Sequence, residues 1–166
     1  MKHLKTILLA TALCFATVSF TQAQSKVAHI NTQELIAAMP AAKAAQSELE
    51  TLGKTYQTDI EASITEYQKT VKQYEAEAAT KTDEENQKRG LELQEKQQRI
   101  QKFRADAQKH IAEKEAELFK PIQEQAMKAI NDVAKAQGYD YVLDISTLIV
   151  ANGKNILTDV KKQLGI

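Results

Sequence analysis

The chain has 166 residues, of which 43% are hydrophobic and 27% charged, and its 22 basic residues balance 22 acidic ones. This zero formal charge does not indicate a nucleic-acid partner, which a strongly basic chain would. The single cysteine, Cys14, lies in an N-terminal apolar run, so a chain that has lost this run can form no disulfide.

The first 23 residues are typical of a secretory signal peptide. Two lysines precede an apolar run over residues 7–20, and Thr21-Gln22-Ala23 then places small residues at the −3 and −1 positions of a cleavage site. We therefore expect residues 1–23 to be removed on export. Loss of two of the 22 basic residues leaves a net charge of about −2.

Residues 24–40 are predicted to form the N-terminal part of a small body. Residues 27–30 have the composition of a short strand. Asn31, followed by Glu34 three residues later, is a capping-box arrangement for a helix from Thr32 to about residue 39. Pro40 ends this helix and suits the first position of the next one.

The central part of the chain, residues 41–137, has the pattern of two long amphipathic helices. Apolar residues recur at helical spacing in each half, and residues 80–85 between the halves contain no apolar side chain. The first stripe comprises Leu49, Leu52, Tyr56, Ile60, Ile64, Tyr67, Val71 and Tyr74, and the second comprises Leu93, Ile100, Phe103, Ala107, Ile111, Leu118, Ile122, Ala126, Ile130 and Val133. Each helix can bury only one narrow face, so we expect a turn near 80–85 to fold them into an antiparallel coiled-coil hairpin, an arm roughly 60 Å long.

Such a turn pairs positions whose numbers sum to about 165. Tyr74 then faces Leu91, and apolar side chains face each other along the whole length. This match favours a hairpin over one continuous rod. The second helix beyond residue 122 has no partner in the hairpin, so we expect it to pack on another part of the chain.

Three residues inside the arm are candidate hinges. Gly53 and Gly90 each cost about 1 kcal/mol relative to Ala in a helix. Pro121 removes one backbone hydrogen bond, so a kink is expected there. Flexibility at these positions would let the arm bend.

Three tyrosines are candidate contact residues on the first long helix. Tyr56, Tyr67 and Tyr74 are separated by 11 and 7 residues, so they fall on one helix face. Two interpretations remain open. Either the rings fill the seam against the second helix, or their edges reach past it and contact a bound protein.

Residues 138–166 are predicted to complete the body. Gly138 ends the second long helix, and strands are expected at 139–145, 148–151 and 155–157, the last two joined by a type I′ turn at Asn152-Gly153. Thr158 is expected to cap a last helix from Asp159 to about Leu164.

The predicted fold is therefore α+β, a small β-strand body with a long helical arm. A four-stranded sheet this short buries little apolar area, and such small domains are marginal in isolation. We therefore expect several copies of the chain to share one β-body.

No catalytic or metal-binding pattern is present in the sequence. Only His29 and His110 follow the signal peptide, and they lack zinc-ligand spacing. We expect His29 to face solvent or a subunit contact, and His110 to lie on a solvated helix face. Gly-rich phosphate loops and nucleophile motifs are also absent from the sequence. We therefore expect no enzymatic activity, no metal and no cofactor.

The order of these elements resembles the Skp/OmpH family of periplasmic chaperones. The resemblance is carried by residues 26–35 and 40–46 at one end of the mature chain and by residues 138–144 and 156–160 at the other. It implies a periplasmic homotrimer whose arms surround a cavity. Unfolded outer-membrane proteins would be held in that cavity by an ATP-independent holdase without metal or catalysis.

The charge of the arm departs from the family pattern. Well-known members are basic, whereas residues 75–89 here carry three basic and five acidic side chains. We therefore do not extend the family's direct binding of lipid or lipopolysaccharide to this chain. The alternative interpretation is a structural coiled-coil adaptor or tether in the cell envelope, which would bind one folded partner.

Overall fold

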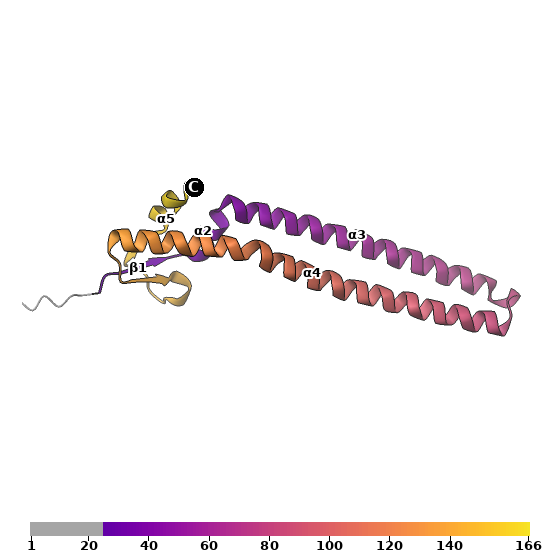
Figure 1. Ribbon diagram of the computed structural model, residues 1–166. Helices are drawn as coiled ribbons and strands as arrows, with labels where there is room; N and C mark the ends of the chain where they lie inside the picture. The colour runs from indigo at the N-terminus through magenta and orange to yellow at the C-terminus, as the bar shows by residue number, and fades with distance from the viewer. Residues whose placement is uncertain (1–24) are drawn as a thin grey trace, which may run out of the picture.

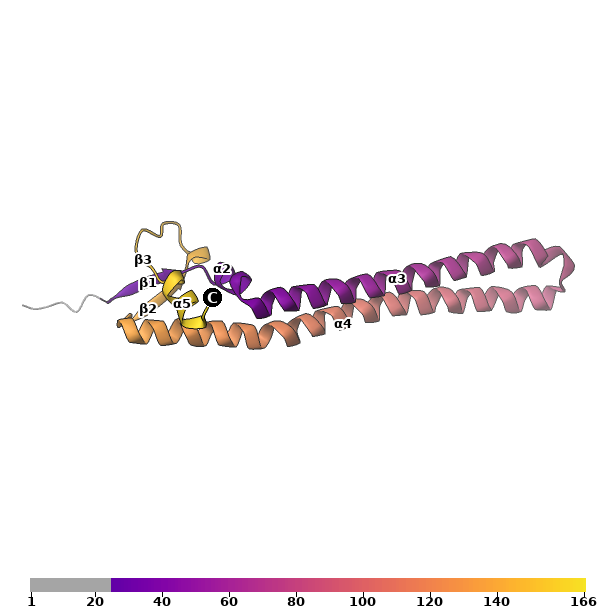
Figure 2. The same cartoon turned by 90° about the horizontal axis from the view of Figure 1, so that it is seen from above.

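The computed structural model describes residues 25–166. The predicted signal peptide lies outside these residues. Figure 1 shows a small body at one end and two long helices that extend from it together, and the perpendicular view in Figure 2 shows the same pairing. The chain is thus mostly helical with a small sheet, in agreement with the predicted α+β class.

The first strand and the first helix lie where the sequence predicts them, β1 at Val27–Ile30 and α2 at Thr32–Ala38. The side chain of Asn31 caps α2 by accepting a hydrogen bond from the backbone N–H of Glu34 at 3.0 Å. The Glu34 carboxylate does not complete the predicted capping box. It accepts a hydrogen bond from Nζ of Lys161 at 3.0 Å instead.

The two long helices are α3 (Pro40–Glu77) and α4 (Asp83–Gln137), joined by the 3₁₀ turn η1 (Ala78–Thr80). Pro40 occupies the first turn of α3, because Met39 before it is extended, with φ −68° and ψ 131°. Gly138 ends α4 in the left-handed conformation, with φ 68°.

The helices α3 and α4 run in opposite directions along the arm. Polar contacts between them join Glu48 to Lys114, Thr70 to Lys96, and Glu77 to Arg89. The residue number on α4 falls as the number on α3 rises. At 1.5 Å per residue, the 38 residues of α3 span about 57 Å.

The sheet has three strands in the order β2-β1-β3, and both pairs are parallel. β2 is Tyr141–Asp144, followed by the 3₁₀ turn η2 (Ile145–Thr147), and β3 is only Lys154–Asn155. The predicted four-stranded sheet is therefore wrong, since residues 148–151 form no strand.

The predicted type I′ turn at Asn152-Gly153 is also wrong. Such a turn requires positive φ at both central residues. Within residues 25–166, only Gly138 and Gly165 have positive φ. β3 pairs in parallel with the distant β1 instead of folding back on its neighbour, so a tight turn is not needed.

The last helix, α5 (Leu157–Leu164), begins two residues earlier than predicted. Its first N–H groups are not capped by Thr158. The side-chain oxygen of Asn155 accepts a hydrogen bond from the N–H of Leu157 at 2.9 Å. The last residue of β3 thus satisfies one of the N–H groups at the start of α5, whose N-cap position is Ile156.

The body has one apolar core, built from both ends of the chain. Its largest fully buried side chains are Ile30, Leu35, Ile156 and Val160. The C-terminal part of α4 joins them through Ile122, Ala126, Ala129, Ile130 and Val133. This confirms that α4 beyond residue 122 packs on another part of the chain.

His29 lies inside the body, so the expectation that it faces solvent or a subunit is wrong. Its exposed fraction is only 6%. It belongs to the central strand, with β2 on one side and β3 on the other. A Cβ placed on Gly153 would lie 3.7 Å from its Nδ1, so the chain before β3 also covers the ring.

Candidate functional site

The arm carries the candidate site residues, and its seam follows the predicted stripes. The eight apolar residues of the α3 stripe, Leu49 to Tyr74, are all half-buried between the helices. On α4 the stripe is half-buried as far as Leu118, apart from the buried Ala107, and fully buried beyond it. The seam is thus narrow, because each helix turns only one face to its partner.

Tyr56 packs in this seam against α4. Its ring meets that of Phe103 edge to face, with centroids 5.8 Å apart. Its hydroxyl and Nδ1 of His110 lie 2.8 Å apart and share a hydrogen bond. His110 is exposed, as expected, but it is also a partner of Tyr56.

Tyr67 is half-buried at the edge of a hollow between α3 and α4. The hollow measures about 340 Å³, and its apolar lining includes Ile100 and Phe103. Polar side chains, among them Lys96 and Arg99, lie around it. Of the three tyrosines, Tyr67 alone borders this hollow.

Tyr74 is held by polar partners on two sides. Its hydroxyl donates a hydrogen bond to the carboxylate of Glu92 at 2.7 Å, and the guanidinium of Arg89 lies 4.5 Å from its ring centroid. The hydrogen bond to Glu92, with burial, raises the pKa of the Tyr74 hydroxyl above its usual value.

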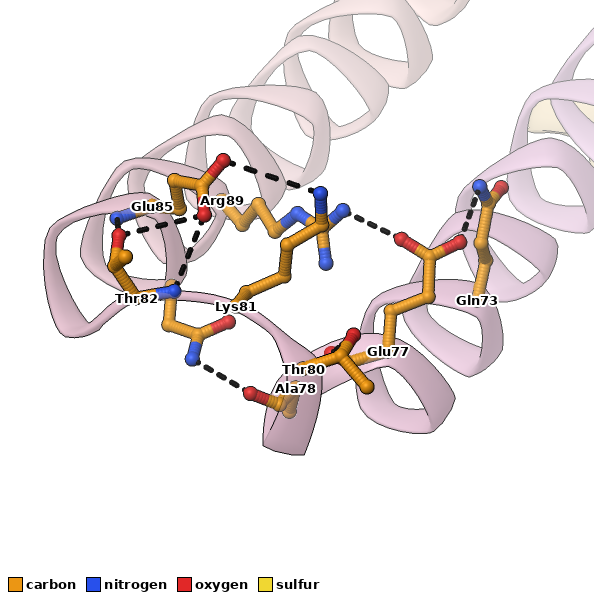
Figure 3. A network of polar contacts seen from close by, with 9 residues as sticks. Gln73, Glu77, Ala78, Thr80, Lys81, Thr82, Glu85 and Arg89 are labelled. Carbon is orange, nitrogen blue, oxygen red and sulfur yellow. Dashed lines mark hydrogen bonds and ion pairs between the residues drawn. The ribbon is translucent and has the colours of Figure 1, made fainter.

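Arg89 links the two helices close to the turn (Figure 3). Its Nη2 lies 2.5 Å from Oε2 of Glu77, and Gln73 donates a hydrogen bond to the other oxygen of that carboxylate at 3.0 Å. These two donors lower the pKa of Glu77, with the larger effect from Gln73. The Nη1 atom of Arg89 is buried without a hydrogen-bond partner among the described residues.

The N-terminus of α4 is capped by Thr82 (Figure 3). The N–H of Glu85 donates to the hydroxyl of Thr82, and the N–H of Thr82 donates back to the Glu85 carboxylate at 3.1 Å, which completes a capping box. This backbone bond from Thr82 lowers the pKa of Glu85. Asn86 also donates to the carbonyl of Ala78 at 3.0 Å, so the turn is tied on both sides.

The predicted pairing of the helices is off by one residue at Tyr74. Pairs that sum to 165 place Tyr74 opposite Leu91, whereas the structure pairs it with Glu92, a sum of 166. One residue rotates a helix by about 100°. Leu91 accordingly faces outward, with an exposed fraction of 58%.

The candidate hinges lie within unbroken helices. α3 continues through Gly53, and α4 continues through Gly90 and Pro121. A Cβ added at either glycine would meet no atom within 4 Å, so packing does not require glycine there. Pro121 has no N–H to donate to the carbonyl of Glu117.

A second exposed feature lies on the sheet of the body. Val27 pairs with Tyr141, and Leu143 follows two residues later on the same face of β2. Their exposed fractions are 44%, 59% and 40%. Ile149 and Val150 in the following loop are also exposed. The exposed side chains of Val27, Tyr141 and Leu143 form an apolar body face, and β2 lies at the edge of the sheet.

The described part of the chain contains neither a group of metal-ligand side chains nor a helix suited to span a membrane. Among residues 25–166, no three His, Cys, Asp or Glu side chains are grouped so that they could hold a metal ion. No helix in the same part of the chain is both long and apolar enough to cross a membrane.

Comparison with known proteins identifies relatives that span nearly the whole chain. It is 28% identical over 148 residues to "Chaperone protein Skp" of Photorhabdus laumondii, which covers 86% of this chain and 87% of the relative. It is 25% identical over 157 residues to the protein of the same name from Pectobacterium atrosepticum, covering 92% and 93%.

The fold also matches a solved structure, that of an OmpH-like outer membrane chaperone from Caulobacter crescentus. The TM-score is 0.76 at 20% identity, over 86% of this chain and 85% of that one. The model of the family described as "Outer membrane protein (OmpH-like)" matches residues 26–164. This match takes in β1, both arm helices, the sheet and α5, and the chain therefore belongs to the OmpH-like outer membrane protein family.

Proposed function

We propose that this protein is an ATP-independent periplasmic holdase that binds unfolded outer-membrane proteins and prevents their aggregation. The observation that carries the proposal is the arm, two helices of 38 and 55 residues that extend from the body. The relatives named as Skp chaperones cover this arm along with both parts of the body. In this proposal the client binds to side-chain surface on the arm.

Each part of the chain has its own role in this proposal. Residues 24–40 and 138–166 would form the body, residues 41–137 the arm, and residues 1–23 the export signal. The body would join three copies of the chain. The apolar body face of Val27, Tyr141 and Leu143 supports this association, because exposed apolar side chains at a sheet edge favour contact with another chain. Ile149 and Val150 in the loop after β2 add further exposed apolar side chains.

The arms would hold the client through many weak contacts. Several arms around one unfolded chain raise the overall affinity without any single strong site. Tyr67, beside its apolar hollow, is better placed for such a contact than Tyr74, whose ring and hydroxyl are occupied by Arg89 and Glu92. Bending at Gly53, Gly90 and Pro121 would adapt the arms to clients of different size.

The test is light scattering after a urea-unfolded outer-membrane β-barrel is diluted into buffer, with and without residues 24–166 and without ATP. We expect aggregation to be suppressed near one trimer per client. A barrel that has already folded serves as the control and should not bind. Unchanged aggregation with several unrelated barrels would contradict the proposal, and binding to one folded envelope protein would favour a coiled-coil tether instead.

A further inference from the structure

A groove lies at the root of the arm, where α2 meets α3. Its volume is about 560 Å³, within the range of about 300–1,000 Å³ that is usual for small-ligand sites. Nine residues from three helices line it: Gln33, Ile36, Ala37, Ala42, Lys43, Gln46, Ser47, Glu50 and Phe119. It is separate from the three tyrosines and from the apolar body face.

The groove follows from the break between the two helices. Met39 is extended and Pro40 starts a new helix, so α2 and α3 meet at an angle instead of forming one rod. Small side chains such as Ala37 and Ala42 then leave space in this corner. Ile36 and Phe119 contribute its larger apolar surface, and both pack on the body core.

The polar groups around the groove carry no net charge. Lys43 and Glu50 balance each other, and the remaining polar groups are two glutamine amides and the hydroxyl of Ser47. The Gln46 amide donates one hydrogen bond to the Glu50 carboxylate at 3.1 Å and keeps its carbonyl oxygen as an acceptor. A balanced site of this kind does not attract an anionic headgroup. Amide groups both donate and accept hydrogen bonds, so they match the unpaired N–H and C=O groups of an extended backbone.

The groove by itself is too small to form a stable interface with a folded partner. Stable protein interfaces take about 20–30 residues from each side, whereas nine line this groove. A strand of an unfolded membrane barrel, by contrast, alternates apolar with polar side chains and leaves its backbone groups unpaired. One or two of its apolar side chains suit a groove whose lining combines apolar side chains with two amides.

We propose that this groove is a docking site for apolar side chains of an extended, unfolded client segment. The proposal rests on the proposed holdase function and adds a defined position to it. The arm root would hold one short segment of the client, while the rest of the client moves among the arms.

The experiment uses a synthetic ten-residue peptide in which Leu and Tyr alternate with Ser and Thr. Its binding to ¹⁵N-labelled residues 24–166 is followed by backbone amide shifts. We expect the largest shifts at the amides that line the groove, among them Gln33, Ala37 and Gln46. A scrambled peptide with its apolar residues in one block, and an all-polar peptide, serve as ligand controls.

Two matched variants test the location. Ala37 and Ala41 are both exposed helical alanines, but only Ala37 lines the groove. Ala37→Gln places a polar side chain in the groove, and we expect the peptide to bind at least fivefold more weakly. Ala41→Gln should bind within about twofold of the parent protein. Neither change removes a buried contact, so both variants should fold.

The outcomes separate this proposal from the holdase proposal. The groove proposal would be contradicted if the peptide shifted amides elsewhere, or if both variants lost peptide affinity equally. This holds even if the parent protein prevents barrel aggregation. If the peptide shifts the groove amides but the protein does not prevent barrel aggregation, the groove proposal is supported and the holdase proposal is contradicted. A lower mass for Ala37→Gln alone would show a contact between copies and would also overturn the groove.

Discussion

The guanidinium of Arg89 lies over the ring of Tyr74, 4.5 Å from its centroid, and joins the two arm helices beside their turn. This places Tyr74 in a polar contact between helices. If Tyr74 only fills the seam, changing its partners should lower the stability of the arm. If it contacts a client, the same changes should weaken client binding.

Replacement of Arg89 by Met should loosen the end of the arm without unfolding the body. The variant loses the contact with the Tyr74 ring and the ion pair with Glu77. We expect amide hydrogen exchange around the turn to become about two- to fivefold faster, in keeping with a partly exposed cation–π contact. Exchange at Leu35 should not change. If amide exchange at the turn were as slow in the variant as in the parent protein, Arg89 would not hold the helices together.

Tyr67 and Tyr74 should differ in their effect on client binding. Tyr74→Phe removes the hydrogen bond to Glu92 but leaves the ring in the seam, so we expect less stability at the turn and unchanged retention of an unfolded barrel. Tyr67→Ala opens the hollow further and should weaken retention several-fold. Retention is measured as the dissociation rate of a fluorescent barrel. The reverse order would support Tyr74 as the client contact.

Asp144 should make the stability of the body sensitive to acid. Its carboxylate accepts hydrogen bonds from Ser146 and from the hydroxyl and N–H of Thr32, and these donors lower its pKa from 3.8 to about 2. A lowered pKa stabilises the folded state above 3.8, and this contribution is lost as the pH falls through about 2.

Because Asp144 is partly exposed, we expect that contribution to be about 1 kcal/mol. Urea unfolding measured between pH 5 and pH 2 should show it in the parent protein and much less of it in Asp144→Asn. The exposed Asp106, changed to Asn, is the control. An equal pH dependence in the parent and the Asp144 variant would count against this account.

The body core should be far more sensitive to truncation than the arm surface. Leu35 is fully buried, so Leu35→Ala should lower the free energy of unfolding by about 3 kcal/mol through lost burial and a cavity. Leu91 is 58% exposed, and Leu91→Ala should change the free energy of unfolding by less than about 0.5 kcal/mol. Urea denaturation followed by circular dichroism measures both.

The apolar body face should control self-association. Changing Tyr141 and Leu143 together to Glu places two charges on this face, and we expect the mass in sedimentation equilibrium to fall toward that of one chain. Leu91→Glu puts the same kind of charge on an exposed leucine of the arm and should leave the mass unchanged. An undiminished mass in the double variant would show that copies meet elsewhere.

Local signals in the sequence predicted the helices well. The apolar stripes identified the seam, and Pro40 and Gly138 mark a helix start and a helix end as predicted. Periodicity defines which face of a helix is buried, but it does not fix the register between two helices to a single residue. The pairing with Glu92 and Arg89 was therefore missed.

The sheet could not be predicted in the same way, because its pairs are distant in the sequence. Val27 pairs with Tyr141, and Ala28 with Lys154. The Asn152-Gly153 dipeptide is a strong local hairpin signal, but the pairing of β3 with β1 overrides it. Burial of His29 follows from the same long-range arrangement.

The central position of β1 has a consequence for how the chain becomes folded. A ribosome makes β1 first and both of its neighbours last, since Tyr141 comes 114 positions after Val27 in the sequence. The arm helices need only local contacts and can form early, whereas closing the sheet requires both ends of the chain. Until the final segment emerges, the nascent protein carries an unpaired apolar strand, so a protein proposed to guard others against aggregation passes through an aggregation-prone stage during its own synthesis.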